Sequence, residues 1–244
     1  MASQELNRVA MVIAAHADDA EFMAAGTVAT WIKDEWEVYY IICTNGGGGG
    51  PDDAQDVSME ARQQIIDIRK REQEKAAATL GVKKVIFLGY PDSQLEPRVL
   101  RRDLVREMRR YRPSRVICQS PERVWQPALA LGAHHIDHRI VGEATLDAIY
   151  PACQNPWDFP ELFTEEKLHP HKVSEIYIVG TPFANHVVDV SETIDAKIQA
   201  LRSHESQLGD RIDRIGEYVK QRAEKIGQRH QIQYAEEFHL TYNP

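Results

Sequence analysis

A histidine and two aspartates stand together near the N-terminus, directly after a run of apolar residues. The run Val9–Ala15 is followed by His16, Ala17, Asp18 and Asp19. Histidine nitrogen combined with carboxylate oxygen is a ligand set that suits zinc and its first-row neighbours. An apolar run of this length is typical of a buried strand, and ligands bind at the carboxyl ends of strands in open α/β sheets. The alternative is that an aspartate here caps a helix that follows the strand.

A second polar cluster, His134–His138, lies far along the chain. It contains three histidines and one aspartate, and it can supply the third ligand that the first cluster lacks. Either cluster alone is a weak indication, whereas two segments with complementary ligand types indicate one shared site. We therefore predict that both clusters lie at the same edge of a sheet, within reach of one metal ion.

Short apolar runs rich in valine and isoleucine alternate with helix-length segments along the chain. Such near-continuous runs are typical of parallel strands covered on both faces. The sequence therefore predicts one α/β domain over residues 1–244, with a three-layer, Rossmann-like, mostly parallel sheet and helices on both faces. The expected strands are Val9–Ala15, Val38–Cys43, Val85–Leu88, Arg115–Cys118, Glu175–Val179 and Val187–Val190. The expected helices are Ala20–Lys33, Ser58–Leu80, Pro97–Tyr111, Ile140–Tyr150 and Ser191–Gln207.

Two other segments stand out inside this domain. Residues Pro151–His171 are rich in prolines and aromatic side chains, which predicts an insertion or a lid. The segment Asn45–Pro51 contains a run of glycines but lacks the lysine and hydroxyl residue of a phosphate-binding loop. Acidic residues follow it and would repel a phosphate. We interpret it as a mobile loop that gives a substrate access to the site, the alternative being a plain flexible connection.

Composition excludes several classes of partner. The chain has 244 residues, 43% of them hydrophobic and 27% charged, as in a soluble globular protein. A net charge of −8 argues against binding to nucleic acid or to an anionic membrane surface. The three cysteines show no CxxC spacing and predict no disulfide framework. No apolar stretch approaches the ~20 residues of a membrane span, so we expect a cytoplasmic protein. The sequence is compatible with a homo-oligomer.

Two signatures of a known family occur in this chain. The segment Ala15–Asp19, followed by Gly26, resembles the AHPDD…G signature of the PIG-L/LmbE-like de-N-acetylases. The segment His135–Gly142 resembles that family's second signature, HPDHxxxG. Ala17 and Ile136 replace the two prolines, which removes no candidate ligand. Further segments that are similar to the family follow in the expected order, namely Arg69–Glu72, Leu80–Val82, Phe87–Asp92, Thr193–Lys197, His204–Gln207 and Tyr234–Phe238.

The resemblance implies a zinc site and a role for each motif residue. His16, Asp19 and His138 would bind zinc, or another divalent first-row metal, and three protein ligands leave one position open for water. Asp18 would then be the general base that accepts a proton as water attacks an amide. His135 would stabilise the oxyanion or protonate the leaving amine.

Three further residues have implied roles, each with a plain structural alternative. Asp137 would orient His135 through a hydrogen bond, the alternative being that it caps a helix starting near Arg139. Arg69 and Asp92 match positions that lie near sugar hydroxyls in the family. The alternatives for these two are an arginine on a helix surface and an aspartate in a turn.

The expected activity is zinc-dependent removal of an acetyl group from a small-molecule substrate of the N-acetylglucosamine type. An amidase acting on a related thiol–sugar conjugate is one alternative. A non-catalytic protein that binds a sugar or a nucleotide is another. The intact Asp18 favours an enzyme, because a pure binding protein has no need of a spare carboxylate beside a metal.

Overall fold

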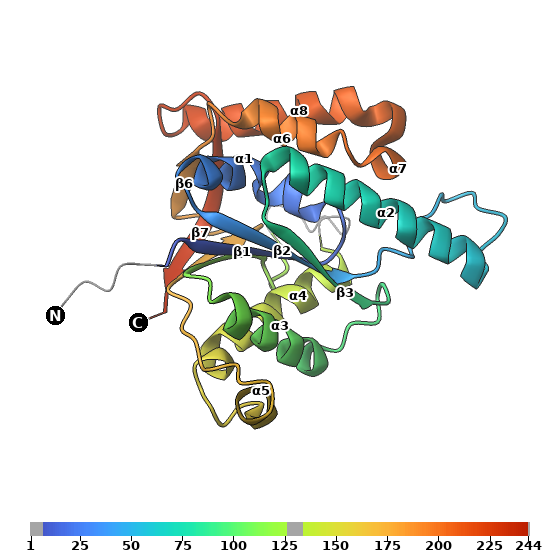
Figure 1. Cartoon of the computed structure of the whole chain (residues 1–244). Coiled ribbons are helices and arrows are strands. Elements are labelled where there is room, and N and C mark those ends of the chain that lie inside the picture. Colours follow the sequence, from blue (N-terminus) through green and yellow to red (C-terminus); the bar gives the residue numbers. More distant parts are fainter. Residues whose placement is uncertain (1–6, 126–133, 244) are drawn as a thin grey trace.

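The computed structural model describes residues 7–125 and 134–243, which form a seven-stranded sheet between two layers of helices (Figure 1). The strand order is β3-β2-β1-β4-β5-β7-β6. Strands β1 to β5 pair in parallel, whereas β7 runs antiparallel to both β5 and β6. The expected three-layer, mostly parallel α/β fold is confirmed. The strands are β1 (Val9–Ala14), β2 (Glu37–Thr44), β3 (Lys84–Tyr90), β4 (Arg115–Gln119), β5 (Glu175–Val179), β6 (His186–Asp189) and β7 (Ala235–Tyr242).

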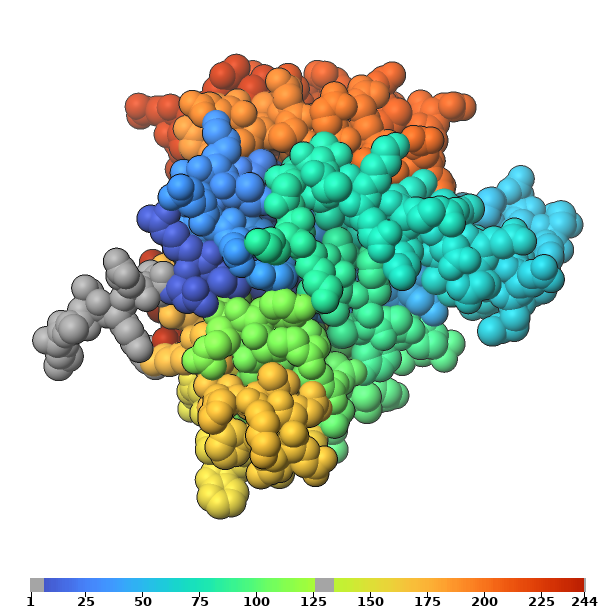
Figure 2. All heavy atoms as spheres, viewed as in Figure 1, coloured from blue at the N-terminus to red at the C-terminus, as the bar shows by residue number. Residues whose placement is uncertain are grey.

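Helices cover both faces of this sheet (Figure 1). One layer contains α1 (Asp19–Lys33), α2 (Met59–Leu80), α6 (Ile194–Leu201), α7 (Glu205–Leu208) and α8 (Ile212–Gln228). The other contains α3 (Pro97–Tyr111), α4 (Ile136–Asp147), the π-helical segment η2 (Ala148–Cys153) and α5 (Pro160–Thr164). A 3-10 turn, η3 (Gly209–Arg211), precedes α8. The first turns of α2 project from the body of the protein (Figures 1 and 2). None of the helices in the described residues is both long and apolar enough to cross a membrane.

The central position of β1 explains its sequence. Met11 and Ile13 point into the core beneath α3 and α4, while Ala10 and Val12 point into the core beneath α1 and α2. Every residue of the strand is buried, so every position must be apolar. The chain runs outward from β1 to β2 and β3, and then returns to β4 on the other side of β1. The crevice between the ends of β1 and β4 is therefore the switch point of the sheet, where α/β proteins bind ligands.

The C-terminal third departs from the sequence expectations in two ways. Strand β7 and helix α8 were not expected, because acidic and polar residues interrupt both segments. Glu236 is nevertheless buried in β7, where Lys197 lies 2.5 Å from its carboxylate. The helix expected over 191–207 is broken after Leu201, and the buried His204 turns inward at the break.

The segment Pro151–His171 packs against α3. Arg102 donates to Glu161 at 2.8 Å, and the buried Arg109 donates to the carbonyl oxygen of Cys153 at 3.1 Å. These contacts anchor the segment on the helical layer, and its interpretation as an insertion stays a prediction. A role as a lid stays a prediction.

The close approach of α4 to β4 leads to a stability prediction. A Cβ atom at Gly142 would lie 2.4 Å from the carbonyl oxygen of Gln119, so Gly142→Ala must push α4 away from the sheet. We expect the free energy of unfolding in urea to fall by about 1–3 kcal/mol, the usual cost of overpacking. Glu143→Ala, at an exposed position of the same helix, is the control and should change it by less than about 0.5 kcal/mol. Equal stability of the two variants would contradict this packing.

Candidate active site

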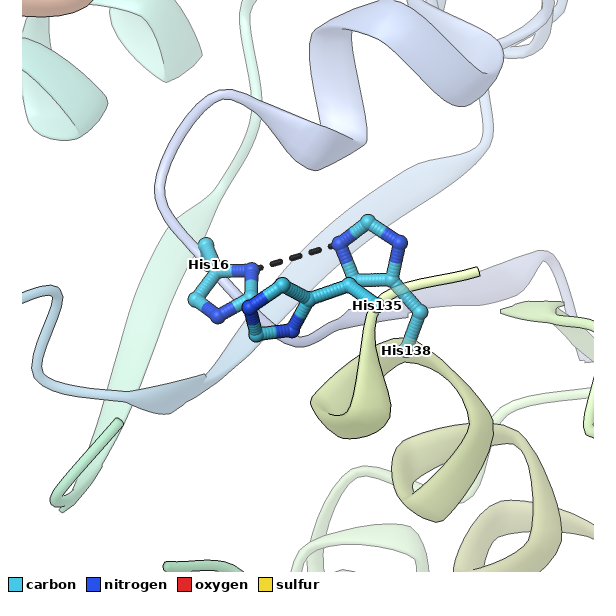
Figure 3. A group of neighbouring side chains, drawn as sticks. All are labelled: His16, His135 and His138. Atoms are coloured by element: carbon cyan, nitrogen blue, oxygen red, sulfur yellow. Dashed lines mark hydrogen bonds between the residues drawn. The ribbon is translucent and has the colours of Figure 1, made fainter. Parts of the chain in front are cut away.

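Two segments bring three histidine rings together at the switch point of the sheet. His16 follows β1, whereas His135 and His138 stand at the start of α4 (Figure 3). The centroid of the His16 ring is 4.7 Å from that of His135 and 5.2 Å from that of His138. Ring nitrogens of the three residues lie within 4.8 Å of one another. The two polar clusters, far apart in the sequence, thus meet at one edge of the sheet.

Asp19, the first residue of α1, adds oxygen atoms to this group. Its Oδ1 lies 3.1 Å from His138 Nε2, and its Oδ2 lies 3.4 Å from His16 Nδ1. His16 Nδ1 and His138 Nε2 are themselves 3.3 Å apart. Ligand atoms bound about 2.05 Å from a tetrahedral zinc ion are separated by about 3.3 Å. These spacings, which involve both oxygens of Asp19, are short enough for His16, Asp19 and His138 to be candidate ligands of a single ion.

Gln119 holds the Asp19 carboxylate in place. Asp19 Oδ2 accepts hydrogen bonds from the His16 amide at 2.8 Å and from Gln119 Nε2 at 3.1 Å. Gln119 ends β4, and its Oε1 accepts a bond of 3.2 Å from the Ala15 amide next to β1. It therefore joins the two strands across the crevice. Gln119 was not predicted from the sequence, although a polar residue that ends an apolar strand is the feature that would have revealed it.

Asp137 contacts His16 rather than its neighbour His135. Its Oδ2 lies 3.0 Å from His16 Nε2 and accepts a bond of 2.8 Å from the Ser93 amide. A carboxylate on Nε2 fixes the imidazole tautomer and leaves Nδ1 free for a metal. His135 Nδ1 is 3.8 Å away, because it caps α4 by accepting a bond from the Asp137 amide at 3.2 Å. The orientation of His135 by the Asp137 carboxylate is thus not found, and Asp137 is not the helix cap either.

The helix cap determines where His135 carries its proton. A ring nitrogen that accepts a hydrogen bond is unprotonated, so the neutral ring has its proton on Nε2. Burial and the nearby His16 and His138 lower the pKa of His135, which favours this neutral form. The side chain is 44% exposed, so its N–H group is accessible to a ligand as a neutral donor.

The candidate ligands His16, Asp19 and His138 are called the ligand cluster below. The negative charges of Asp19 and Asp137 favour the binding of a cation in this cluster. Burial on its own lowers the pKa of His16, but the hydrogen bonds with Asp137 and Asp19 outweigh it and raise that pKa to about 10. Burial on its own raises the pKa of Asp19, but the hydrogen bonds and charges of His138 and His16 hold that pKa well below its usual range. A metal ion that binds here takes the place of a proton between these groups.

Asp18 lies beside the ligand cluster and has an unusual backbone conformation. Its φ of 89° is in the left-handed region, at a cost of roughly 1–3 kcal/mol for a residue other than glycine. Burial and the charge of Asp19 raise the pKa of Asp18 to about 7. Within the described residues its side chain makes no capping bond to α1, so the helix-cap alternative has no support. The carboxylate faces Arg69, whose Nη2 lies 3.6 Å from Oδ2.

Arg69 is buried, which excludes the alternative of an arginine on the surface of α2. Its Nη2 donates to the carbonyl oxygen of Ala17 at 2.7 Å. A Cβ atom at Gly49 would lie 2.2 Å from Nη1, so the glycine-rich loop packs directly against this side chain. A contact between Arg69 and a substrate stays a prediction.

Three consecutive backbone amides of the glycine-rich loop, those of Gly46, Gly47 and Gly48, donate hydrogen bonds to side chains of the protein itself. Asp92 accepts bonds of 2.9 and 2.7 Å from the amides of Gly46 and Gly48. The side chain of Asn45 accepts one of 2.9 Å from the Gly47 amide. These bonds support the argument against a phosphate-binding loop, because the amides already have acceptors. They also hold in place a loop that we expected from the sequence to be mobile. They also account for Asp92 as a structural residue, so its contact with a substrate stays a prediction.

A cleft of about 510 Å³ adjoins the ligand cluster. Asp19, Gln119 and His138 line one end, and side chains of α8 and β7, among them Tyr218 and Glu236, line the other. Its volume is within the range of about 300–1,000 Å³ that is usual for small-molecule sites.

The fold and this donor set together define a class of protein. Histidine and carboxylate side chains gathered at the switch point of a doubly wound sheet are an arrangement that could hold a metal ion at the strand ends. The model of one family, described as PIG-L, GlcNAc-PI de-N-acetylase, matches residues 11–149, which is more than half of the chain. The chain belongs to this family.

Similar proteins extend the comparison over nearly the whole chain. A diacetylchitobiose deacetylase of Thermococcus kodakarensis is 29% identical over 93% of this chain and 80% of its own. A probable N-acetyl-α-D-glucosaminyl L-malate deacetylase 2 of Bacillus anthracis is 26% identical over 85% of each chain. The structure of N,N′-diacetylchitobiose deacetylase from Pyrococcus horikoshii, in complex with an inhibitor, matches with a TM-score of 0.84. It is 26% identical and covers 96% of this chain and 84% of its own.

The contact between Asp137 and His16 leads to a prediction about metal affinity. In Asp137→Asn a neutral amide replaces the carboxylate and makes His16 a weaker ligand. We expect the metal to bind about 10–100-fold more weakly, as measured by competition with a chelator of known affinity. Asp147→Asn, at an exposed position of the same helix, is the control and should bind metal like the native protein. Unchanged affinity with lower turnover would mean that Asp137 acts through His135 instead.

Proposed function

We propose that this protein is a zinc-dependent N-deacetylase that acts on a small molecule with an N-acetylglucosamine-type group. The observation that carries the proposal is the spacing of 3.1–3.4 Å among the candidate ligand atoms of His16, Asp19 and His138. Asp18 is adjacent to Asp19 in the chain, and its carboxylate lies 3.6 Å from Arg69. Membership of a de-N-acetylase family supports the reaction type. The names of the similar deacetylases from Thermococcus and Bacillus support the substrate class.

The donor set suits zinc or another divalent first-row metal. Two imidazole nitrogens and one carboxylate, without thiolates, are ligands that zinc accepts in catalytic sites. His16, Asp19 and His138 would hold the ion and leave a fourth position for water or substrate. When bound there, zinc lowers the pKa of a water molecule and polarises the amide carbonyl.

Asp18 and His135 supply the proton transfers and the oxyanion contact. Asp18 accepts a proton from the water molecule while the water oxygen attacks the acetyl carbon. The Nε2–H group of His135 donates to the carbonyl oxygen as negative charge develops on it. The C–N bond then breaks, the amine leaves with a proton returned by Asp18, and acetate is the second product. Arg69 and Asp92 remain our candidates for contacts with sugar hydroxyls.

Asp18 and Asp19 differ in role although they are adjacent, and this difference can be measured. Asp18→Asn keeps the shape of the side chain and is not a ligand, so we expect one zinc per chain to remain. Its kcat for release of amine from N-acetylglucosamine derivatives should fall by about 10²–10⁴-fold, the usual contribution of a positioned proton acceptor. Asp19→Asn should lose zinc itself, as measured by elemental analysis.

The panel of substrates should include N-acetylated monosaccharides, disaccharides and thiol–sugar conjugates, each assayed for free amine after metal content is measured. Loss of zinc from Asp18→Asn together with its retention in Asp19→Asn would exchange the two roles. Full activity in both variants would place the active site elsewhere. Turnover of the thiol conjugates alone would favour the amidase over the deacetylase.

A further inference from the structure

A row of buried polar side chains runs from the backbone of Asp18 to the junction of α6 and α7. Gln73 of α2 accepts a hydrogen bond through Oε1 from the Asp18 amide at 3.0 Å. Its Nε2 donates to Glu21 Oε1 at 2.9 Å. Glu21 Oε2 lies 3.0 Å from His204 Nε2. Gln73 and Glu21 are fully buried and His204 is 1% exposed, and none of the three belongs to the proposed set of ligands and catalytic residues.

The hydrogen-bonding groups in this row fix the orientation of Gln73. A backbone amide can only donate, so the side-chain oxygen of Gln73 must face Asp18. Its nitrogen then faces Glu21, whose carboxylate accepts the bond. If the Gln73 amide turned over, its oxygen would face the Glu21 carboxylate and its nitrogen would face the Asp18 N–H. Glu21 therefore keeps the acceptor of Gln73 pointed at Asp18.

Gln73 and Arg69 together hold one peptide unit. The N–H of Asp18 and the carbonyl oxygen of Ala17 belong to the same planar peptide group. Gln73 binds the N–H end at 3.0 Å, and Arg69 binds the oxygen end at 2.7 Å. The two side chains are four residues apart and therefore lie on the same face of α2. This helix thus clamps the peptide plane that precedes the Asp18 Cα.

The hydrogen bonds of Gln73 and Arg69 act on the peptide next to Asp18, the residue with the unusual backbone conformation. The plane of the Ala17–Asp18 peptide sets the φ angle of Asp18, which is 89°. A residue other than glycine keeps such a conformation only where its surroundings enforce it. Release of the amide would let φ relax to a negative value and turn the carboxylate to a different direction. The direction of that carboxylate decides whether it can reach a water molecule beside the ligand cluster.

We propose that Gln73, backed by Glu21 and His204, is a positioning residue that aims the Asp18 carboxylate for proton transfer. The proposal rests on the proposed function, because it assumes that Asp18 is the general base. It assigns a task to buried residues that touch neither the candidate ligands nor a substrate. The relay, defined as Gln73, Glu21 and His204, acts through the backbone of Asp18.

The test begins with Gln73→Met, which keeps the length of the side chain and removes the acceptor. We expect the kcat of the zinc-loaded protein to fall by about 10²-fold, the cost of displacing a reacting group by roughly 1 Å. The KM and the zinc content should stay within about twofold of the native values, since Gln73 touches neither substrate nor ligand atoms. Hydrogen exchange of the Asp18 amide, followed by NMR, should become at least about tenfold faster, because its acceptor is gone.

Variants of Glu21 test whether the orientation of the Gln73 amide matters, because they leave Gln73 itself unchanged. Glu21→Gln retains an oxygen that can accept from Gln73 Nε2, and its kcat should stay within about threefold of the native value. Glu21→Met leaves Gln73 free to turn, and it should lower kcat and speed exchange of the Asp18 amide as Gln73→Met does. Thr30→Val is the matched control. Thr30 lies on the same helix as Glu21 and bonds to Gly26 and Thr193, and among the described residues it forms no hydrogen bond with Gln73, Glu21 or His204. This variant should leave kcat unchanged.

The outcomes decide between a positioning role and a merely structural one. Native kcat and native Asp18 exchange in Gln73→Met would overturn the proposal. An equal loss of kcat in Thr30→Val, or a loss in Gln73→Met that follows its zinc content, would overturn it as well. If Gln73→Met does not fold, the contrast between Glu21→Gln and Glu21→Met applies the same test. If the native protein releases no amine from any N-acetylated sugar, the proposed function fails, while the exchange rate of the Asp18 amide still shows whether Gln73 holds that peptide.

Discussion

Two buried carboxylates on either side of one imidazole are the constraint on which the rest of the site depends. Asp137 and Asp19 approach opposite nitrogens of His16, at 3.0 and 3.4 Å. Charges removed from water cost several kcal/mol each unless they are paired and hydrogen-bonded. The Ser93 amide and Gln119 offset part of this cost through their bonds to the carboxylates. A divalent cation between His16, Asp19 and His138 would compensate the remaining negative charge, so the electrostatics and the ligand geometry favour the same occupant.

The fold brings these groups together because chain order and strand order differ. Strands β1 and β4 are neighbours in the sheet, although β2 and β3 come between them in sequence. The candidate ligands come from the end of β1 and from the start of α4, the helix that follows β4 in the chain, and Gln119 links the ends of the two strands. Helix α2 also contributes to the site, since Arg69 and Gln73 lie on one face of this helix and both bond to the peptide that precedes Asp18. The glycine-rich loop packs against Arg69 at Gly49.

The sequence alone predicted the parts of the structure that follow local rules. The apolar runs identified β1 to β6, because a strand buried on both faces must be apolar at each position. Strand β7 was not predicted, because its sequence is not apolar at each buried position. Its buried Glu236 is compensated by Lys197 and by the amides of Gly26 and Thr27, partners that no periodicity reveals. The partner of Asp137 was mistaken for a similar reason, since the sequence suggests the adjacent His135 and the fold supplies His16. Gln119 and Gln73 were missed because a single amide side chain carries no pattern before its partners are known.

Diffraction from crystals of the zinc-loaded protein, recorded on both sides of the zinc absorption edge, tests the central claim most directly. We predict one anomalous peak per chain, about 2.0–2.1 Å from His16 Nδ1 and His138 Nε2 and about 2.0–2.2 Å from an oxygen of Asp19. Asp18 should lie outside the coordination shell, with its φ still positive. A peak that is bound through His16 Nε2, or one that includes Asp18 and excludes Asp19, would contradict the assignment of the ligands and with it the proposed general base.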